Sequence, residues 1–432
     1  MENGLAVEWT ITPETRPDVY ELVIPKSTKS KVTFFTDVDS ITFHVEPKRT
    51  YSFVVLLGKD SAYTKIVTRP EPAYFSKKYQ SQNNNKTLVE NPEVYELVNI
   101  VIALTKKGLS DSDLVNHNTK YYNDMIKYFE KFKYDKVVLR FDSILQNQWW
   151  KYFYLKMDAY AFEIKKGKII NGGVYERVNW EYVNTLQPLL SDLQEFYLRT
   201  NFSTFYNDHK ILYAQQISYL QDSINIQGMK HWLSKNFPTT NYNCIKVIYS
   251  PLVYGSQSAI SFQNNRFGEA QVHVNFPYTD ESDIAFSEIE NILRNGSVIF
   301  TELNHSYINP EAEKYLTNAD FIKAFQELDF WERKDSPAKI AYRNGIKCFE
   351  EYLNWSLLSL YIVDNAPKNS QEKLISRIEY NNQEIRGFLK FKEFNQEFIR
   401  LYSQKKAEET VADLLPAIIK WCRKQTTIAT KQ

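Results

Sequence analysis

The chain has little cysteine and little glycine, and each shortage excludes classes of chemistry. Its three cysteines, Cys244, Cys348 and Cys422, form no Cys-x-x-Cys pair. This excludes a cysteine zinc cluster, thioredoxin-like chemistry and a disulfide scaffold, and it predicts buried free thiols. With only 12 glycines, the chain has no glycine-rich phosphate loop, no dinucleotide-binding fingerprint and no Gly-x-Ser-x-Gly nucleophile elbow.

A charge excess of either sign is also missing. Lysine plus arginine number 53 and aspartate plus glutamate 52, so nothing draws the whole chain toward nucleic acid or an anionic membrane. Trp149 and Trp150, followed by Lys151, could stack on bases. A packed aromatic cluster is the expected interpretation, and no nucleic-acid partner is predicted.

Long apolar runs are absent as well. No segment reaches the length of a transmembrane helix, and residues 1–8 lack the pattern of a signal peptide. We expect a cytoplasmic protein if Met1 is the native start, and a periplasmic or secreted one if a signal peptide was removed. Nothing in the sequence indicates an oligomeric state.

What the chain has is a folded composition, 43% hydrophobic and 15% aromatic. Its first part is rich in β-branched and aromatic residues, with predicted strands at 32–35, 40–45, 51–57 and 62–67. The polar stretch 81–86 is typical of a loop or linker. A length of 432 residues favours two domains. We therefore predict a β-rich module over 1–75, a second domain over 76–424 and a tail over 425–432.

The second part is mainly helical, with strands predicted at 244–250, 258–263 and 271–276. After these strands, apolar residues recur at helical spacing and predict a helix over 283–308. A helical C-terminal half follows. This order predicts an α+β fold in which the helix 283–308 packs beneath a sheet containing 244–250 and 271–276, with 271–276 at the sheet edge. Pro310 is expected to end that helix.

The five residues 301–305 read Thr-Glu-Leu-Asn-His. This is the zinc-peptidase motif His-Glu-x-x-His with threonine in place of the first histidine. In the intact motif, two imidazoles on one helix face bind Zn²⁺, and the glutamate is the general base. Glu302 is therefore the candidate base and His305 a candidate ligand, whereas the Thr301 hydroxyl is a poor zinc ligand. A chance Glu-x-x-His on a helix is the competing interpretation.

A catalytic zinc site needs a third protein ligand. In one broad class of zinc peptidases this is a glutamate on a later helix, which makes Glu350 and Glu351 candidates. An ordinary acidic helix edge is the alternative. His273 could substitute for the missing ligand if it turned inward, but a histidine that points outward or is satisfied in the core is the expected interpretation.

Several segments together resemble a bacterial family catalogued as domain of unknown function 4932. Its members carry His-Glu-x-x-His followed by Ser/Thr-aromatic-x-Asn-Pro, and residues 300–310 correspond to that segment. Other similar pieces, spread over nearly the whole chain, are 37–41, 121–124, 201–206, 351–353 and 387–388. The resemblance implies a zincin-like metallopeptidase fold, with His305 and Glu351 as ligands and Glu302 as base. The chain departs from the family at Thr301, so zinc is expected to bind weakly or not at all.

Three functions remain open from the sequence. The leading hypothesis is a metallopeptidase-like protein with a degenerate zinc motif, a pseudoenzyme that binds peptide or protein in the former cleft. The second is an active zinc metallohydrolase that uses a substitute ligand. The third is a structural or assembly protein in which the motif helix serves only packing. Under the first hypothesis, Glu302, His305 and Glu351 converge in one cleft and no peptidase activity remains.

Overall fold

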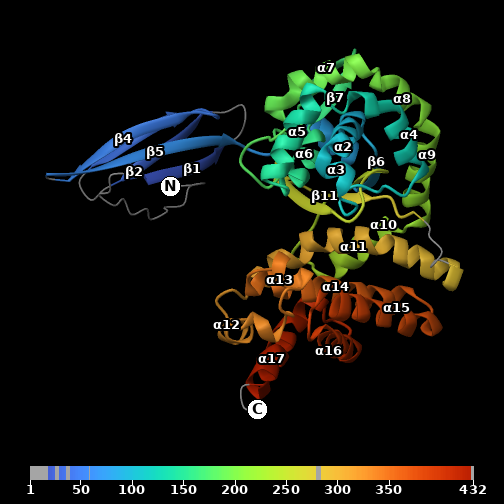
Figure 1. The fold of residues 1–432 in the computed structure, drawn as a ribbon. Coiled ribbons are helices and arrows are strands. Elements are labelled where there is room, and N and C mark those ends of the chain that lie inside the picture. The colour runs from blue at the N-terminus through green and yellow to red at the C-terminus, as the bar shows by residue number, and fades with distance from the viewer. Residues whose placement is uncertain (1–17, 25–28, 36–38, 58, 279–283, 430–432) are drawn as a thin grey trace.

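The computed structural model describes residues 18–24, 29–35, 39–57, 59–278 and 284–429. Figure 1 shows three parts in chain order: a group of strands alone, a body of helices around a sheet, and a group of helices that begins with α11 (Glu288–Glu313). The predicted α+β class is confirmed, with a strand-rich N-terminal part and a helical C-terminal half.

The N-terminal strands form a small module with its own core. They are β1 (Asp18–Ile24), β2 (Ser30–Phe35), β3 (Ser40–Val45), β4 (Thr50–Leu57) and β5 (Asp60–Pro70). β5 pairs in parallel with β1 and antiparallel with β4, and β2 pairs with β3. Aliphatic side chains fill the core: Leu22, Ile24, Val32, Val45 and Ile66. The four predicted strands are confirmed and β1 was not predicted, while residues 1–17 and 36–38 lie outside the described part.

A four-stranded sheet lies inside the body. Its strands are β6 (Lys86–Glu90), β9 (Cys244–Ser250), β10 (Ser258–Asn264) and β11 (Phe267–Asn275), in the order β10-β11-β9-β6. β9 is parallel to both β6 and β11, whereas β10 is antiparallel to β11. The prediction that 271–276 is the sheet edge was wrong. A tight turn at Asn265 and Arg266, both with positive φ, folds β10 back along β11 and makes β10 the outer strand.

The predicted linker at 81–86 was also wrong. Residues 81–83 belong to α1 (Lys77–Asn83), and β6 begins at Lys86. Ser76 caps α1 by accepting from the backbone N–H of Tyr79 at 3.2 Å. The polar composition of this stretch reflects surface exposure rather than a lack of structure.

The two faces of the sheet belong to different cores. On β9, Ile245 and Val247 face the core shared with α11, whereas Cys244 and Ile248 face the core beneath the upper helices. This is the period-two alternation of a strand covered on both faces. α2 (Glu93–Leu104) and α6 (Lys151–Ala159) lie above the sheet, and α11 lies below it (Figure 1).

The rest of the body encloses the upper core. Its helices are α3 (Lys106–Ser110), α4 (Lys120–Phe129), α5 (Lys136–Asn147), α7 (Leu190–Thr200), α8 (Phe202–Asp208) and α9 (Lys210–Ser218). α10 (Ile226–Asn236) instead packs in the core shared with α11. A hairpin joins β7 (Phe162–Lys165) to β8 (Lys168–Asn171). Trp149 and Trp150, before α6, are 51% and 43% exposed. Trp149 packs on Phe153 with ring centroids 6.2 Å apart, so the predicted aromatic cluster forms around Trp149 but lies at the surface.

The motif helix α11 is longer than predicted at its C-terminal end. It begins with a capping box, in which Ser287 N–H donates to the Glu290 carboxylate at 2.8 Å; residue 283, its predicted start, lies outside the described part. It was expected to stop before Pro310 but continues to Glu313. Proline has no N–H for the carbonyl of Ser306. The Tyr242 hydroxyl donates to that carbonyl at 2.9 Å and replaces the missing bond.

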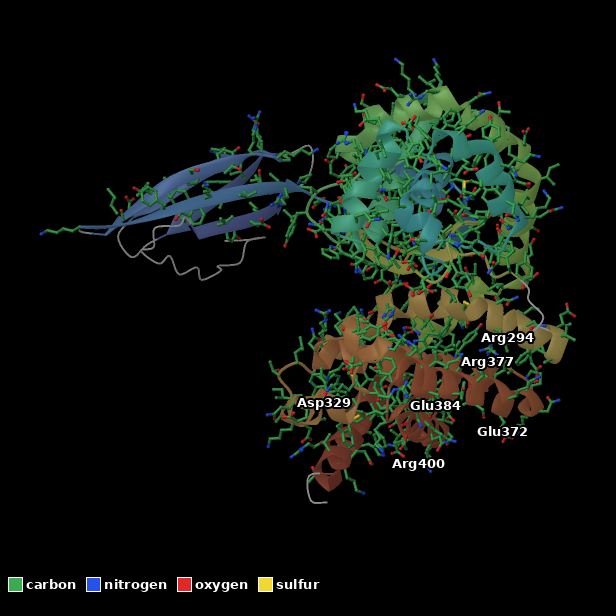
Figure 2. All side chains as sticks on the ribbon, viewed as in Figure 1. Arg294, Asp329, Glu372, Arg377, Glu384 and Arg400 are labelled. Atoms are coloured by element: carbon green, nitrogen blue, oxygen red, sulfur yellow. The ribbon has the colours of Figure 1, made fainter. Side chains whose placement is uncertain are left out.

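Helices pack beneath α11 in the C-terminal half. They are α12 (Ala319–Ala324), α13 (Pro337–Ala341), α14 (Gly345–Asn365), α15 (Lys368–Tyr380), α16 (Phe391–Gln404) and α17 (Val411–Ala429). Arg294 of α11 and Arg377 of α15, both labelled in Figure 2, share the ring of Phe286, with Cζ 3.9 and 5.7 Å from its centroid. α17 contains residues 425–429 of the predicted tail, and 430–432 lie outside the described part.

Two sequence predictions concern the chain as a whole. The three cysteines are buried and unbridged, as predicted. Within the described ranges, no helix has both the length and the apolar character needed to cross a membrane.

Candidate functional site

Two helices bring His305 and Glu351 into contact. α11 carries His305, α14 carries Glu351, and Nε2 of the histidine lies 3.3 Å from Oε1 of the glutamate. His305 Nδ1 lies 3.3 Å from Oδ1 of Asn309, one turn further along α11. Glu351 is buried, whereas the His305 side chain is 22% exposed. The imidazole is therefore held from both nitrogens at a position that solvent reaches.

Asn354 is the third neighbour of the imidazole. Its amide nitrogen lies 2.8 Å from His305 Nε2, and it follows Glu351 by about one helical turn, so both reach the same face of α14. A neutral Nε2 accepts from this amide, and a protonated Nε2 would meet the amide oxygen after a half-turn of the group. Burial alone would lower the pKa of His305, but Glu351, helped by Glu302 and Asn309, raises it to about 9. The ring is therefore mainly imidazolium at neutral pH.

Arg386 neutralises the other side of Glu351. A guanidinium nitrogen donates to Oε2 of Glu351 at 2.7 Å and to the Tyr342 hydroxyl at 2.8 Å. A second guanidinium nitrogen donates to Asn382 Oδ1 at 2.8 Å. Burial would raise the pKa of Glu351, but the charges of Arg386 and His305 hold it well below its usual range. Glu351 is thus a carboxylate with a cation at each oxygen.

Glu302 lies one turn before His305 on α11 and is partly exposed. Burial raises the pKa of Glu302 above its usual value, and His305 is the largest of the opposing influences. The charges of Glu351 and Lys156 also act on this carboxylate. The structure therefore brings His305 and Glu351 into contact, with Glu302 close enough for the charges of both to act on its carboxylate. That all three converge in one cleft stays a prediction.

The two reserve candidates are engaged differently, although the charge of His305 also acts on Glu350. The carboxylate of Glu350 is turned to Lys347, 2.7 Å away. His273 is on the upper face of the sheet, since its neighbours Val272 and Val274 face the core shared with α11. Its ring packs on Tyr95, with centroids 5.6 Å apart. His273 is therefore on the opposite side of the sheet from the motif helix.

A zinc site can be tested against these positions. Two ligands of one tetrahedral Zn²⁺, each at about 2.0–2.2 Å, lie about 3.3–3.6 Å apart, so the 3.3 Å between His305 Nε2 and Glu351 Oε1 suits a shared ion. The third ligand position, residue 301, does not suit the ion, because the Thr301 hydroxyl donates to the carbonyl of Val298 at 3.1 Å. In the part of the chain that the structure describes, no group of three or more His, Cys, Asp or Glu side chains is arranged to hold a metal. The residues present do not complete a zinc site.

Sequence reasoning missed Asn354, Tyr342 and Arg386. Asn354 could have been found, because its spacing of three from Glu351 places both on one helix face. Tyr342 follows the short helix α13, and Arg386 ends a π-helical turn over Asn381–Arg386. No periodicity links either of them to α14, so only the tertiary structure identifies them.

Comparison of the chain with family models, curated proteins and solved structures finds no match. The resemblance to the His-Glu-x-x-His family stays a prediction. Function must therefore be inferred from the residues of the site and their surroundings.

Proposed function

We propose that this protein is a metallopeptidase-like pseudoenzyme that binds an extended peptide without cleaving it. The observation that carries the proposal is the 3.3 Å contact between His305 and Glu351, beside a Thr301 hydroxyl that is bonded to its own helix backbone. Two potential donors have the spacing that a shared zinc ion would need, which supports the proposal, and Thr301 supplies no third. Without a held metal, Glu302 has no metal-activated water from which to take a proton.

The surroundings of the motif support a zincin-like origin. α11 packs against β10 and β11 on one side and against α14 on the other. Tyr242 links the edge strand to the motif helix: its hydroxyl bonds the Ser306 carbonyl of α11 and also interacts with the Ser261 side chain of β10. A peptide lying along β10 would therefore pass beside Glu302 and His305.

β10 offers backbone groups for such a peptide. Trp180 Nε1 donates to the carbonyl of Ala259 at 3.0 Å, so the backbone of Ala259 points away from β11. Backbone directions alternate along a strand, which makes Ser261 and Gln263 point the same way, and both are exposed. For the described residues, no backbone hydrogen bond is made on that side of Ser261 or Gln263. An added strand could pair with this edge.

Exposed aromatic rings adjoin the start of β10. Trp180 is 50% exposed, and its ring centroid lies 6.0 Å from that of Phe153 and 5.9 Å from that of Tyr154. Trp149 extends the group, 6.2 Å from Phe153. Recognition surfaces between proteins are enriched in such rings. Together with the open backbone edge, they favour a polypeptide ligand with apolar or aromatic side chains.

Binding of fluorescently labelled peptides from a degenerate library tests the proposal. Ser261→Pro removes an outward N–H and should weaken binding about 10-fold or more, since a lost hydrogen bond of about 1.5 kcal/mol corresponds to that factor. Ser261→Ala keeps the N–H and should bind like the unmodified protein. No peptide should be cleaved, with or without added zinc.

The alternatives predict different results in the same assay. Zinc-dependent cleavage that disappears in Glu302→Gln would favour an active metallohydrolase with a substitute ligand. Absence of both binding and cleavage would favour a structural or assembly protein, in which α11 serves only packing.

A further inference from the structure

The upper face of the central sheet carries a row of completely covered polar side chains. On β11, Glu269, Gln271 and His273 alternate with Ala270 and Val272, which face the core shared with α11. All three polar residues are 0% exposed. The buried faces of such sheets are normally apolar, because a polar group without a partner loses free energy on burial. Each of these side chains therefore needs a partner.

One half of the row finds its partners within the protein. Glu269 accepts from the hydroxyls of Tyr79 and Tyr175 and from Nε2 of Gln271 at 2.7 Å. The ammonium of Lys246 on β9 lies 3.8 Å from Oε2 of Glu269 and balances its charge. This half is a closed hydrogen-bonded network.

The other half has polar atoms without partners. Neither ring nitrogen of His273 has a hydrogen-bond partner among the residues that the structure describes, and neither do Gln271 Oε1, Ser258 Oγ and Tyr95 Oη. Ser258 is paired directly with His273 in the β10–β11 register, so the two side chains are on the same face. The Tyr95 ring is 5.6 Å from the His273 ring, and Gln271 is the next residue along that face. Ser258 and the Tyr95 ring therefore adjoin His273, and the Gln271 amide, whose nitrogen bonds Glu269, is next along the same face.

We infer that buried water binds at this place and bridges His273, Ser258, Gln271 and Tyr95. The inference is independent of the peptide-binding function, because His273 is on the opposite face of the sheet from the motif helix. Buried waters typically make about three hydrogen bonds to polar groups that the protein leaves unpaired. Leaving these groups unpaired would instead cost the full desolvation penalty of each.

The chemistry of the four groups selects water over other ligands. Burial, and then the charge of Lys156, holds the pKa of His273 well below its usual value, so the ring has one donor and one acceptor nitrogen. The Ser258 and Tyr95 hydroxyls can each donate or accept, and Gln271 Oε1 only accepts. A metal would find one imidazole lone pair and neutral oxygens, and an anion would face the Gln271 carbonyl oxygen. Of these three ligands, only water can both donate hydrogen bonds to the acceptors and accept hydrogen bonds from the donors among the four groups.

Water-to-protein cross-relaxation NMR on protein labelled at its histidines tests the inference. The chain has six histidines, and loss of a signal in His273→Phe assigns the His273 ring protons. These protons should show the cross-peak of a long-lived bound water even though the residue is fully buried. If His273→Phe does not fold, His273→Gln provides the assignment.

A hydroxyl proton near His273 can relay a cross-peak that resembles the signal of bound water, and two variants distinguish these sources. Tyr95→Phe and Ser258→Ala each remove one hydroxyl, and a water signal should persist in both variants. Absence of a cross-peak at His273 in the folded protein would overturn the inference. Its loss in either hydroxyl variant would also overturn it, because the signal would then belong to that side chain.

Discussion

Nε2 of His305 on α11 lies 3.3 Å from Oε1 of Glu351 on α14, and each side chain has a further polar partner. Asn354 holds the imidazole, and Arg386 holds the other oxygen of Glu351 at 2.7 Å. The pair has the spacing of two zinc ligands, and under the proposed function the missing component is a donor at Thr301. The predictions below follow from these contacts and from those that position α11.

Thr301→His should create a zinc site. It adds an imidazole one turn before His305, on the same face of α11. Loss of a mere outer-shell partner weakens metal affinity about 10–100-fold, so gain of a direct ligand should strengthen zinc binding at least that much. Isothermal titration with zinc measures this, with Thr301→Val as the matched control. Equal affinities of the two variants would contradict the ligand assignment.

Arg386→Leu should destabilise the protein by about 3 kcal/mol. This is the lower end of the range for breaking a buried ion pair, and we choose it because the arginine side chain is 23% exposed. The change leaves the Glu351 carboxylate buried with one cation instead of two. Glu351→Leu in the same chain removes that carboxylate, so the double variant should lose less than the sum of the single changes. Urea unfolding of all four proteins measures the coupling, and strict additivity would show that the pair is not coupled.

Tyr242→Phe should cost about 1–3 kcal/mol of unfolding free energy, because it leaves the buried Ser306 carbonyl without a donor. In a Pro310→Ala background the new N–H of residue 310 can reach that carbonyl. The same Tyr242→Phe change should then cost clearly less. Thermal unfolding of the unmodified protein and the three variants tests this, and an equal cost in both backgrounds would mean that Tyr242 does not replace the bond missing at Pro310.

Lys156 should make stability rise with pH above neutrality. Burial lowers its pKa from 10.5 to about 7, against a smaller opposing influence of Glu302. Between these values the unfolded chain binds a proton that the folded protein does not, so the unfolding free energy should rise by at most about 1.4 kcal/mol per pH unit. Below pH 7 both states are protonated and this contribution is flat.

Lys156→Met isolates that contribution. The difference in unfolding free energy between the unmodified protein and this variant should change from pH 7 to pH 10 in favour of the unmodified protein. A difference that stays constant over this range would mean that the ammonium remains protonated in the fold.

Local patterns predicted the parts of the fold that depend on local preference. Strands such as 40–45 combine β-branched and aromatic residues between polar turns, and the structure has β3 at those residues. The strand β1 was missed because Asp18 and Glu21 interrupt its apolar residues, and its pairing with β5 is distant in sequence. The α+β class follows from element order, which a sequence does show.

The errors came from contacts that are distant in the chain. The rule that a helix stops before proline fails at Pro310 because Tyr242 supplies a hydrogen bond. The alternation in β11 was consistent with an exposed polar face, but α2 and α6 cover that face and bury His273. At the candidate site, the motif identified Glu302 and His305, whereas Arg386 reaches Glu351 from an unrelated turn.

Metal analysis of the purified protein after incubation with zinc and removal of free ions tests the central claim most directly. With two donor side chains and no third, we predict well under one equivalent of retained zinc, and no change in His305→Ala. Tight retention of one equivalent that disappears in His305→Ala would contradict the account, because another residue would then complete the site.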